Sequence, residues 1–504
     1  MLKNIRRAIA IVVLLLLTLL FLDFTGTLHA GLGWLAKIQF VPAILAGAFV
    51  VVIFWLLMTA FFGRIYCSVA CPLGLLQDAI AWFGKKSKKN RYSFSPNRKT
   101  LRIAVCVVFI GALIVSFFQP IIGIVANLLE PYSAFGRIAT NLFSPLWRWG
   151  NNALAFFAER ANSYAFYETD VWLKCGWSLG VAAITFIVVA VLAWRGGRTY
   201  CNTICPVGTL LGFASRRAVV KIVIDESKCS GCGLCEKNCK SACINSKQRT
   251  IDYSRCVVCM DCIGKCKRGA IKYGVAPKKV RRAVGDTESK CDAPASTSRR
   301  AFLTGAVAMA ATTAIQAQKK KVDGGLAVIK DKVVPERATP ILPPGAVNAR
   351  SFAHKCTACQ LCVSACPNNV LRPSSDLNRF MQPEASYERG YCRPECTSCS
   401  NVCPNGALLP LTREEKSSTQ IGRAVWIKQN CLAASKNERC DNCARHCPTG
   451  AIQMVAPDEG DKKGHRIPVI DVERCIGCGA CENLCPARPF SGIVVEGVDT
   501  QKLM

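Results

Sequence analysis

The stretch GRIYCSVACPLGLL at residues 63–76 organises the whole chain, because it returns as GRTYCNTICPVGTLL at residues 197–211. Each copy follows an apolar segment and carries two cysteines, separated by three residues, before a proline. The repeat predicts an approximate internal two-fold arrangement that gathers four thiols at the ends of two apolar helices. These thiols are Cys67, Cys71, Cys201 and Cys205, and we expect them to bind iron as thiolates.

The composition indicates a membrane protein with soluble parts. Of the 504 residues, 51% are hydrophobic, and 32 are cysteines. A disulfide-rich secreted scaffold is excluded, because such domains are short and lack long apolar helices. The net charge of +31 is concentrated in basic runs, at residues 85–99 and 278–300. Such runs beside apolar helices follow the positive-inside rule, and cluster-bound thiolates would offset much of the charge, so nucleic acid is not an expected partner.

Four segments are apolar enough to be transmembrane helices, which need about 20 residues. They cover residues 8–24, 41–62, 101–125 and 171–194. Lys3, Arg6 and Arg7 place the N-terminus in the cytoplasm, so both C-x3-C-P motifs face the cytoplasm. The sequence therefore predicts a multi-pass protein of the bacterial inner membrane. The loop at residues 126–170 is either a helix on the membrane surface, packed over a quinone pocket, or a re-entrant connection.

The expected fold is an α-helical membrane domain of four helices, plus a fifth from an internal segment, with two α+β bacterial-ferredoxin-like domains. The fifth helix would come from SRRAFLTGAVAMAATTAIQA at residues 298–317, which resembles a twin-arginine (Tat) export signal. If it crosses uncleaved, the C-terminal domain is periplasmic. The alternative is a short buried helix of a second cytoplasmic domain, and the lysines at 319–321 argue mildly against crossing.

The expected boundaries are a membrane domain at 1–215, a cytoplasmic two-cluster ferredoxin at 216–275, a basic linker at 276–297, the signal-like segment at 298–318, a proline-rich linker at 319–350 and a periplasmic four-cluster ferredoxin at 351–500.

The cysteines after residue 215 follow the bacterial ferredoxin spacing C-x2-C-x2-C-x3-C. In this pattern three thiolates bind one [4Fe–4S] cluster and the fourth binds a second cluster. The first domain has two runs, and the expected ligand sets are Cys229, Cys232, Cys235 with Cys266, and Cys256, Cys259, Cys262 with Cys239. Lys240 and Lys267 replace the usual proline after the fourth cysteine. A cation beside a cluster raises its potential unless solvent screens the charge.

The C-terminal domain has four further quartets, so six [4Fe–4S] clusters are expected in the two ferredoxin domains. The quartets are Cys356, Cys359, Cys362, Cys366; Cys392, Cys396, Cys399, Cys403; Cys431, Cys440, Cys443, Cys447; and Cys475, Cys478, Cys481, Cys485. The inner two are stretched at their first interval, which suggests nested pairing of the first with the fourth and the second with the third. The second quartet also has radical-SAM spacing, but Cys403 provides a fourth ligand and no barrel-sized region surrounds it.

The four thiols of the repeated motif suit one additional iron–sulfur cluster. The alternatives are two clusters completed by other ligands, another metal such as copper, or thiol–disulfide chemistry. The cytoplasm disfavours a structural disulfide, and the neighbouring ferredoxin domain favours iron. Of the remaining cysteines, Cys106 and Cys175 lie in apolar helices, and Cys243 is a weaker alternative to Cys239 as a ligand.

These motifs resemble two known families. Residues 1–275, with the duplicated GR-x-Y-C-x3-C-P and the two-cluster tail, are similar to the NapH-type membrane ferredoxin proteins, which are related to the membrane core of NosR. Residues 296–495, with the twin-arginine segment and four quartets, resemble the exported ferredoxins of the NapG and MauM type. The fusion of both in one chain departs from either family. The resemblance implies an electron-transfer subunit of quinol dehydrogenase type, with membrane lipid, the quinone pool and a periplasmic reductase or other redox subunit as partners.

Quinol releases two electrons and two protons, so its site needs a proton acceptor near the membrane edge. Glu130, in LLEPYSAFGR, is the candidate, with Arg137 as its partner and His29 as a second option. A carboxylate that caps a helix is the plainer interpretation of Glu130. Two other functions stay open: an assembly or regulatory protein for a metalloenzyme, and an outward conduit from a cytoplasmic ferredoxin. A dihaem subunit is excluded, because the chain has no C-x-x-C-H motif and only four histidines.

Overall fold

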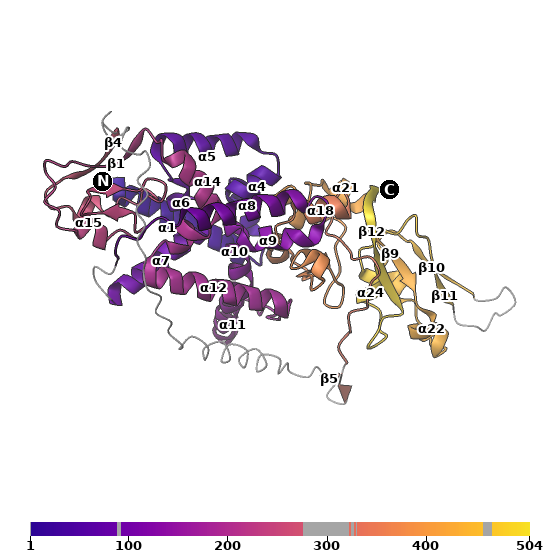
Figure 1. Cartoon of the computed structure of the whole chain (residues 1–504). Coiled ribbons are helices and arrows are strands. Elements are labelled where there is room, and N and C mark those ends of the chain that lie inside the picture. The colour runs from indigo at the N-terminus through magenta and orange to yellow at the C-terminus, as the bar shows by residue number, and fades with distance from the viewer. Residues whose placement is uncertain (1, 88–91, 276–321, 324–326, 329, 457–465) are drawn as a thin grey trace, which may run out of the picture.

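The computed structural model describes residues 2–87, 92–275, 322–323, 327–328, 330–456 and 466–504. A helical domain forms the middle of the molecule, with a small cysteine-rich α+β domain at each end (Figure 1). The predicted combination of a helical domain with two α+β domains is confirmed at this level. The expected basic linker and signal-like helix, at residues 276–318, lie outside the described residues.

Four helices correspond to the predicted membrane segments: α1 (Leu2–Leu22), α5 (Phe49–Phe62), α8 (Lys99–Val115) and α12 (Gly176–Gly196). Among the described residues, α1 and α12 are long and apolar enough to cross a membrane. The second predicted segment is divided, because Gly47 adopts a left-handed φ of 72° between α4 (Phe40–Leu45) and α5. The third ends at Val115, and a separate 3-10 turn begins at Pro120. The prediction of four uninterrupted spans is therefore wrong for these two segments.

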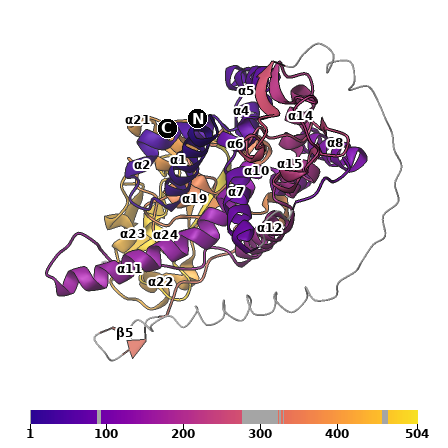
Figure 2. The ribbon, with the colours of Figure 1, turned by 90° about the vertical axis from the view of Figure 1, so that its left-hand side faces the viewer.

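The loop predicted at residues 126–170 folds into and then along the helical domain. Its helical elements are α9 (Gly123–Leu129), α10 (Pro131–Ile138), a π-helical turn (Ala139–Phe143) and α11 (Ser144–Arg160). All residues of α10 are buried, whereas α11 exposes Trp147 and Phe157. Figure 2 shows α11 at the edge of the molecule, away from α8 and α14 (Pro206–Ser215). The segment is thus buried within the protein at α10 and superficial at α11, and its predicted relation to a membrane stays a prediction.

The first cysteine-rich domain follows the helices directly. Its elements are β1 (Val220–Ile224), α15 (Leu234–Lys237), β2 (Ile244–Asn245), β3 (Thr250–Ile251), a 3-10 turn (Ile263–Lys265) and β4 (Ile271–Val275). β1 pairs with β4 and β2 pairs with β3, both antiparallel. The end of α5 holds this domain in place: the N–H of Val219 donates to the carbonyl of Ala60 at 3.1 Å, and the Tyr273 hydroxyl donates to the carbonyl of Phe62 at 2.9 Å.

The C-terminal domain consists of short helices and antiparallel strand pairs. The helices are α18 (Ala349–Lys355), α19 (Leu361–Ala365), α20 (Ser398–Val402), α21 (Arg413–Ser418), α22 (Leu432–Ser435), α23 (Asn442–Arg445) and α24 (Ala480–Asn483). The strand pairs are β7 (Leu371–Pro373) with β8 (Pro383–Ala385), β9 (Thr419–Trp426) with β12 (Ile493–Leu503), and β10 (Ile452–Val455) with β11 (Ile467–Ile470). Four of these helices, α19, α20, α23 and α24, begin between the second and third cysteines of a quartet. The secondary structure is therefore arranged around the quartets.

The proline-rich segment predicted as a linker belongs to this C-terminal domain from residue 330 onward. Residues 341–346 are buried, and Ile341 forms a β-bridge with Ala385. Arg337 forms an ion pair with Glu482 at 2.6 Å. The linker prediction is wrong for this stretch, because the apolar side chains between the prolines enter the domain core, where an extended edge tolerates proline.

The helix α1 connects the two cysteine-rich domains. At its start, Lys3 lies 3.4 Å from the carboxylate of Asp261 in the first domain. At its end, the Phe21 ring packs against Tyr132 and Phe135 of α10, with centroids 5.9 and 6.0 Å apart. The same α10 contacts the C-terminal domain, so the two cysteine-rich domains lie at opposite ends of α1.

The helix α8 also connects the two cysteine-rich domains. Arg102 donates to the hydroxyl and the carbonyl of Ser254 in the first domain, both at 3.2 Å. Ser116, just beyond the other end, is hydrogen-bonded to His354 of the C-terminal domain at 3.0 Å. At about 1.5 Å per helical residue, these two contacts are about 20 Å apart along the axis. The helical domain therefore separates the two cysteine-rich domains by most of a bilayer core, which is about 30 Å thick.

Candidate metal centres

The two copies of the repeated motif fold in the same way. In each, a left-handed glycine ends the long helix, a short helix carries the first cysteine, and the proline after the second cysteine begins another helix. The glycines are Gly63 and Gly197, with φ of 79° and 70°. The helices are α6 (Tyr66–Val69) and α7 (Pro72–Ser87) in the first copy, and α13 (Thr199–Thr203) and α14 in the second. Proline suits the first turn of a helix, because its missing N–H has no partner there.

The four thiols of this repeat form one group, buried between the helical domain and the first cysteine-rich domain. Cys205 interacts electrostatically with Cys201, Cys71 and Cys67, and Cys71 interacts with Cys201 and Cys67. Each of the four side chains is at most 5% exposed. The two copies thus supply one set of four ligands rather than two separate pairs.

The copies are joined by an exchange of arginines. Arg64 of the first copy donates to the carbonyl of Cys201 in the second, at 3.3 Å. Arg198 of the second copy donates to the carbonyl of Cys67 in the first. Both guanidinium groups are fully buried. The exchange requires close approach, because a Cβ atom on Gly208 would collide with the Cys201 carbonyl and one on Gly74 would lie 2.7 Å from the Cys67 carbonyl.

The side chains around this group fit an iron–sulfur cluster. The Arg64 guanidinium lies 3.7 Å from the sulfur of Cys67, and the Gln77 amide donates to the sulfur of Cys201 at 3.2 Å. Buried cations and N–H donors stabilise thiolates and the negative charge of a thiolate-bound cluster. Within the described part of the chain, no group of three or more Cys, His, Asp or Glu side chains forms a site for a single metal ion. A [4Fe–4S] cluster needs more widely spaced thiolates, because each binds a different iron atom.

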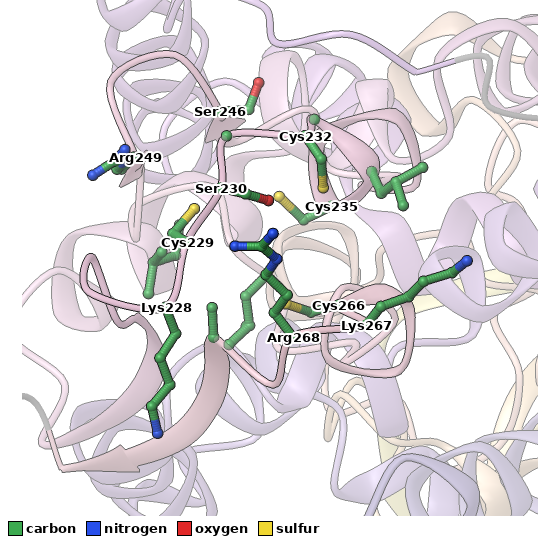
Figure 3. Close-up of a pocket in the computed structure, with 16 residues that line it drawn as sticks. Lys228, Cys229, Ser230, Cys232, Cys235, Ser246, Arg249, Cys266, Lys267 and Arg268 are labelled. Carbon is green, nitrogen blue, oxygen red and sulfur yellow. The ribbon is translucent and has the colours of Figure 1, made fainter.

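The first cysteine-rich domain places its thiols around two spaces. Figure 3 shows Cys229, Cys232, Cys235 and Cys266 around a cavity of about 220 Å³. These are the four residues of the first predicted ligand set, with the fourth cysteine taken from the other quartet. A smaller cavity is lined by the second predicted set, Cys239, Cys256, Cys259 and Cys262, and also by Cys243.

Loops with regular cysteine spacing share a backbone conformation that fits clusters. In four of them, the residues immediately before and after the second cysteine have left-handed φ angles of 51–79°. These residue pairs are Gly231 and Gly233, Val258 and Met260, Ala358 and Gln360, and Gly477 and Gly479. Such turns point successive N–H groups inward and create a concave site for a negative group. Because non-glycine residues adopt this strained conformation in two of the loops, the surrounding structure must hold it in place.

The C-terminal quartets pair differently from the nested arrangement expected. Cys366 of the first quartet lines one cavity with Cys392, Cys396 and Cys399 of the second. Burial raises the pKa of Cys362, and the thiols of Cys359, Cys356 and Cys403 raise it further. Cys443 of the third quartet likewise interacts with Cys485 of the fourth, and Cys447 of the third with Cys475 and Cys478 of the fourth. The prediction of nested pairs is therefore wrong: the first quartet pairs with the second and the third with the fourth, because each neighbouring pair packs as one compact unit.

Cys243, the weaker alternative to Cys239 as a ligand, lies beside Cys239 at the second cluster site. Its sulfur lies 3.6 Å from the sulfur of Cys239, and it also faces Cys256. The hydrogen bond between the two side chains lowers the pKa of Cys239 and raises that of Cys243. These opposite pKa shifts favour Cys239 as the thiolate ligand and Cys243 as a thiol that donates a hydrogen bond to it.

Glu130, which caps the start of α10, and Arg137 within α10 are both buried, and neither lines the cavities described above. The Glu130 carboxylate accepts from the backbone N–H groups of Tyr132, at 3.0 Å, and of Ser133. Arg137 donates to the carbonyl of Asn127 at 2.9 Å and, at 3.4 Å, to that of Ala358 in the first C-terminal quartet. The structure thus gives Glu130 a capping contact and Arg137 a contact between domains. Their role in accepting a proton from quinol stays a prediction.

Sequence reasoning missed the two arginines that close the repeat and the residues that join α10 to the C-terminal domain. Arg64 and Arg198 stand in both copies of GR-x-Y-C, so the repeat itself carried the signal. Gly136 gave no such signal, although a Cβ atom there would collide with the carbonyl of Cys359. His29, the second option for a proton acceptor, is paired with Asp23 at 2.9 Å.

Comparison with protein families identifies the repeated C-x3-C-P motif and the C-terminal domain as iron–sulfur regions. A family described as a 4Fe-4S binding domain matches residues 44–90 and 178–224, which contain the two C-x3-C-P copies. A family described as a 4Fe-4S dicluster domain matches residues 355–425 and 438–488. The two dicluster matches agree with the pairing of neighbouring quartets. The chain is therefore an iron–sulfur protein with several 4Fe-4S clusters.

Three relatives illustrate how far the similarity extends. The methylamine utilization ferredoxin-type protein MauM of Methylobacillus flagellatus is 32% identical over 165 residues, which are 32% of this chain and 70% of that protein. MauM of Methylorubrum extorquens is 30% identical over 207 residues, 38% of this chain and 86% of that protein. The ferredoxin-type protein NapG of Escherichia coli is 33% identical over 154 residues, 28% of this chain and 64% of that protein. Each match leaves most of this chain uncovered.

Proposed function

Because the chain belongs to the family of ferredoxin-type proteins that includes MauM, we propose that it carries electrons between quinol in a membrane and a redox enzyme beyond it. The chain is an iron–sulfur electron-transfer protein, and the proposal adds the donor, the direction and the compartments. The partner would be a periplasmic reductase or another redox subunit. Six [4Fe–4S] clusters in the two ferredoxin domains and a seventh at the C-x3-C-P pair would be the carriers, each passing one electron at a time.

The observation that carries the proposal is that cysteine sites lie at both ends of the helical domain, with the four-thiol group and α10 between them. The four-thiol group contacts the first cysteine-rich domain, since Arg64 also donates to the carbonyl of Ser254 at 3.1 Å. On its other side lies α10, which packs against α7 and α12. The helix α10 then touches the first C-terminal quartet through Arg137 and Gly136. An electron could therefore pass between the ends of the molecule without crossing a region that lacks a cysteine site or a buried aromatic ring.

Buried tyrosines lie in the gap between the four-thiol group and the C-terminal domain. Tyr66 interacts electrostatically with Cys71, and Tyr200 with Cys205. Tyr132 of α10 interacts with Cys359 and Cys403, which belong to one cluster site of the C-terminal domain. These rings are at most 6% exposed, so protein rather than solvent occupies this part of the gap between the two sites.

The proposed topology follows from the same relationships. The helices α1 and α12 would cross the membrane, with the basic N-terminus and the first ferredoxin domain in the cytoplasm. The C-terminal ferredoxin domain, at the other end of α1, would then lie in the periplasm. Its export is proposed to use the twin-arginine-like segment at residues 298–318, which would also provide the additional crossing.

Electron transfer through the four-thiol group can be tested in proteoliposomes. Holoprotein would be reduced by a quinol, and reduction of the C-terminal clusters would be followed by electron paramagnetic resonance. A Cys205→Ser variant should retain the ferredoxin clusters but pass electrons to the C-terminal domain at least tenfold more slowly. Cys106→Ser, which changes a buried cysteine of α8 outside the group, is the matched control and should behave like the unaltered protein. Equal rates in both variants would refute the conduit.

The predicted role of Glu130 has its own test in the same system. Glu130→Gln keeps an oxygen that can accept from the N–H groups at the start of α10, so the helix should persist. If Glu130 accepts a proton from quinol, this variant should lose quinol oxidation while its clusters still accept electrons from dithionite. Unchanged quinol oxidation would place the quinol site elsewhere.

A further inference from the structure

A cavity of about 570 Å³ lies where α1 and α7 meet the first cysteine-rich domain. Its walls come from three parts of the chain that are remote in sequence: residues 3–14, residues 75–85 with Tyr92, and residues 238–265. None of the sites described above uses it. Its volume falls within the range typical of pockets for small organic molecules, about 300–1,000 Å³.

One side of the cavity is polar and strongly cationic. Lys240 bridges Asp78, at 2.7 Å, and Asp261, at 3.5 Å. Arg6 adds a further ion pair to Asp78 at 3.8 Å, and Lys3 pairs with Asp261 at 3.4 Å. The remaining charged residues of the lining, such as Lys85 and Lys265, are also cations. These N–H groups can donate to carbonyl or phenolate oxygens of a ligand.

The other side of the cavity is apolar and continues onto the outer surface of the helices. Ile11 and Leu14 of α1 and Leu75 and Trp82 of α7 line this part of it. Ile11 and Trp82 are more than half exposed, at 52% and 54%. On a helix apolar enough to cross a membrane, such side chains would contact lipid tails. A ligand with a polar ring and a long apolar tail therefore fits the cavity better than a fully water-soluble molecule.

The cavity also lies between two of the metal centres. Asp261 stands between Cys259 and Cys262 in the sequence, and Lys240 follows Cys239, so one wall belongs to the loops of the second cluster site. Leu75 lies in the first turn of α7, directly after Cys71, so the facing wall belongs to the four-thiol group. A ligand in this cavity would be next to both centres. This position favours a redox-active ligand over a structural one.

We propose that this cavity binds the ring of a quinone or quinol, with the ring carbonyls toward Lys240 and Arg6 and the isoprenoid tail along Ile11 and Trp82. The inference rests on the proposed function and assigns a binding site to its substrate, quinol. Oxidation of quinol to quinone breaks two O–H bonds, releases two protons to water at the charged rim, and yields two electrons. Neighbouring 4Fe–4S clusters accept these electrons singly. The site lies at the opposite end of α1 from Glu130, so the two proposed positions exclude each other.

The chemistry of the polar side also suits the phosphate of an anionic phospholipid, and the test must separate the two ligands. Two carboxylates within the cation group argue against phosphate, because each adds a negative charge where the phosphate would lie. A neutral quinone ring meets no such repulsion.

Photolabelling of the holoprotein with an azido-quinone tests the proposal without relying on turnover. We expect label on peptides from residues 2–14 and 72–85, which excess unlabelled quinone removes and excess phosphatidylglycerol does not. Leu14→Trp fills the cavity and should reduce labelling at least tenfold. Leu15→Trp adds the same ring one residue away, at an exposed position that does not line the cavity, and should leave labelling unchanged.

The outcomes separate this site from the broader function. Label confined to α10 or α11, or removal of label by phosphatidylglycerol alone, would overturn the cavity assignment. If the protein still oxidised quinol in proteoliposomes, the conduit would stand and only the position of the site would fall. If quinol oxidation and labelling were both absent, the quinol-linked function would fall as well.

Discussion

Arg198 donates a hydrogen bond to the carbonyl oxygen of Cys67, although the two residues belong to different copies of the repeated motif. The same guanidinium forms an ion pair with Asp78 at 2.6 Å. One side chain therefore holds the second copy, the first copy and the helix α7 together beside the four thiols. Its neighbour in the exchange, Arg64, makes the equivalent contact in the other direction.

Replacing Arg198 should release iron from the four-thiol group. Arg198→Gln removes a fully buried cation from the carboxylate of Asp78, which Lys240 still pairs, so the loss of charged hydrogen bonds should cost about 2 kcal/mol. We expect a lower melting temperature and fewer iron and sulfide ions per protein, with the ferredoxin clusters retained. Arg195→Gln, three residues earlier and exposed, provides the control. An Arg198→Gln protein with full iron content would show that the arginine exchange is dispensable.

Enlarging Gly136 should weaken the contact between α10 and the C-terminal domain. A Cβ atom at this position would collide with the carbonyl of Cys359 and touch the ring of Phe21. Gly136→Ala should therefore cost about 1–3 kcal/mol in stability and slow the reduction of the C-terminal clusters. Gly150→Ala in α11, where nothing lies within 4 Å of the added atom, should do neither. Similar behaviour of both variants in thermal unfolding and cluster reduction would rule out a tight contact at α10.

Two glycines with the same backbone conformation should respond differently to alanine. Gly479 and Gly231 both have left-handed φ angles, so alanine costs each about 1–2 kcal/mol in backbone strain. At Gly479 the added methyl group would also collide with the buried ring of Tyr387, whereas at Gly231 it meets open space. We expect Gly479→Ala to lose about one cluster's iron and Gly231→Ala to keep its iron. Iron and sulfide analysis measures both, and equal losses would mean that backbone strain alone decides cluster retention.

Removing the thiol of Cys243 should change the potential of the second cluster without removing it. If Cys243 donates to the sulfur of Cys239, Cys243→Ala withdraws a hydrogen bond that stabilises the more negative, reduced cluster. The midpoint potential should then fall, while the iron content stays constant. Redox titration followed by electron paramagnetic resonance measures the shift. Loss of iron instead would identify Cys243, rather than Cys239, as the ligand.

The two lysines that replace proline after the fourth cysteine should have unequal effects. Lys240 is largely buried between Asp78 and Asp261, whereas Lys267 is exposed. Solvent screens an exposed charge far more than a buried one. Lys240→Gln should therefore lower the potential of the neighbouring cluster, and Lys267→Gln should leave the potential of its own cluster nearly unchanged. Equal shifts of the two cluster potentials from those of the unaltered protein, measured by the same titration, would contradict an electrostatic role for Lys240.

The sequence predicted features set by neighbouring residues better than features set by contacts between distant parts of the chain. The crossed ligand sets of the first ferredoxin domain follow from the spacing of two adjacent runs, and the structure places those thiols around two cavities. The pairing of the C-terminal quartets depends instead on which loops pack together over long distances. A longer interval, such as that from Cys431 to Cys440, changes one loop but does not indicate which other quartet this loop packs against. Nested pairing was therefore the wrong inference from a correct observation.

Composition is a poor guide to structure where tertiary contacts override local preferences. Prolines near residue 340 favoured a linker, yet Ile341 and Leu342 supply buried surface to the C-terminal domain. The apolar run at residues 41–62 predicted one helix, yet Gly47 divides it. The burial of α10 was equally beyond the sequence, because a short segment with charged residues at positions 130 and 137 enters the domain only when other elements satisfy those charges.

The arginine exchange also bears on the ancestry of the repeat. Each half supplies the guanidinium that the other half requires, so a chain with a single copy could complete the same group only by pairing with a second molecule of itself, as in a two-fold symmetric dimer. Duplication within one chain turns that contact between molecules into a permanent one. Afterwards the two halves are free to diverge outside the shared centre, but neither can be deleted alone.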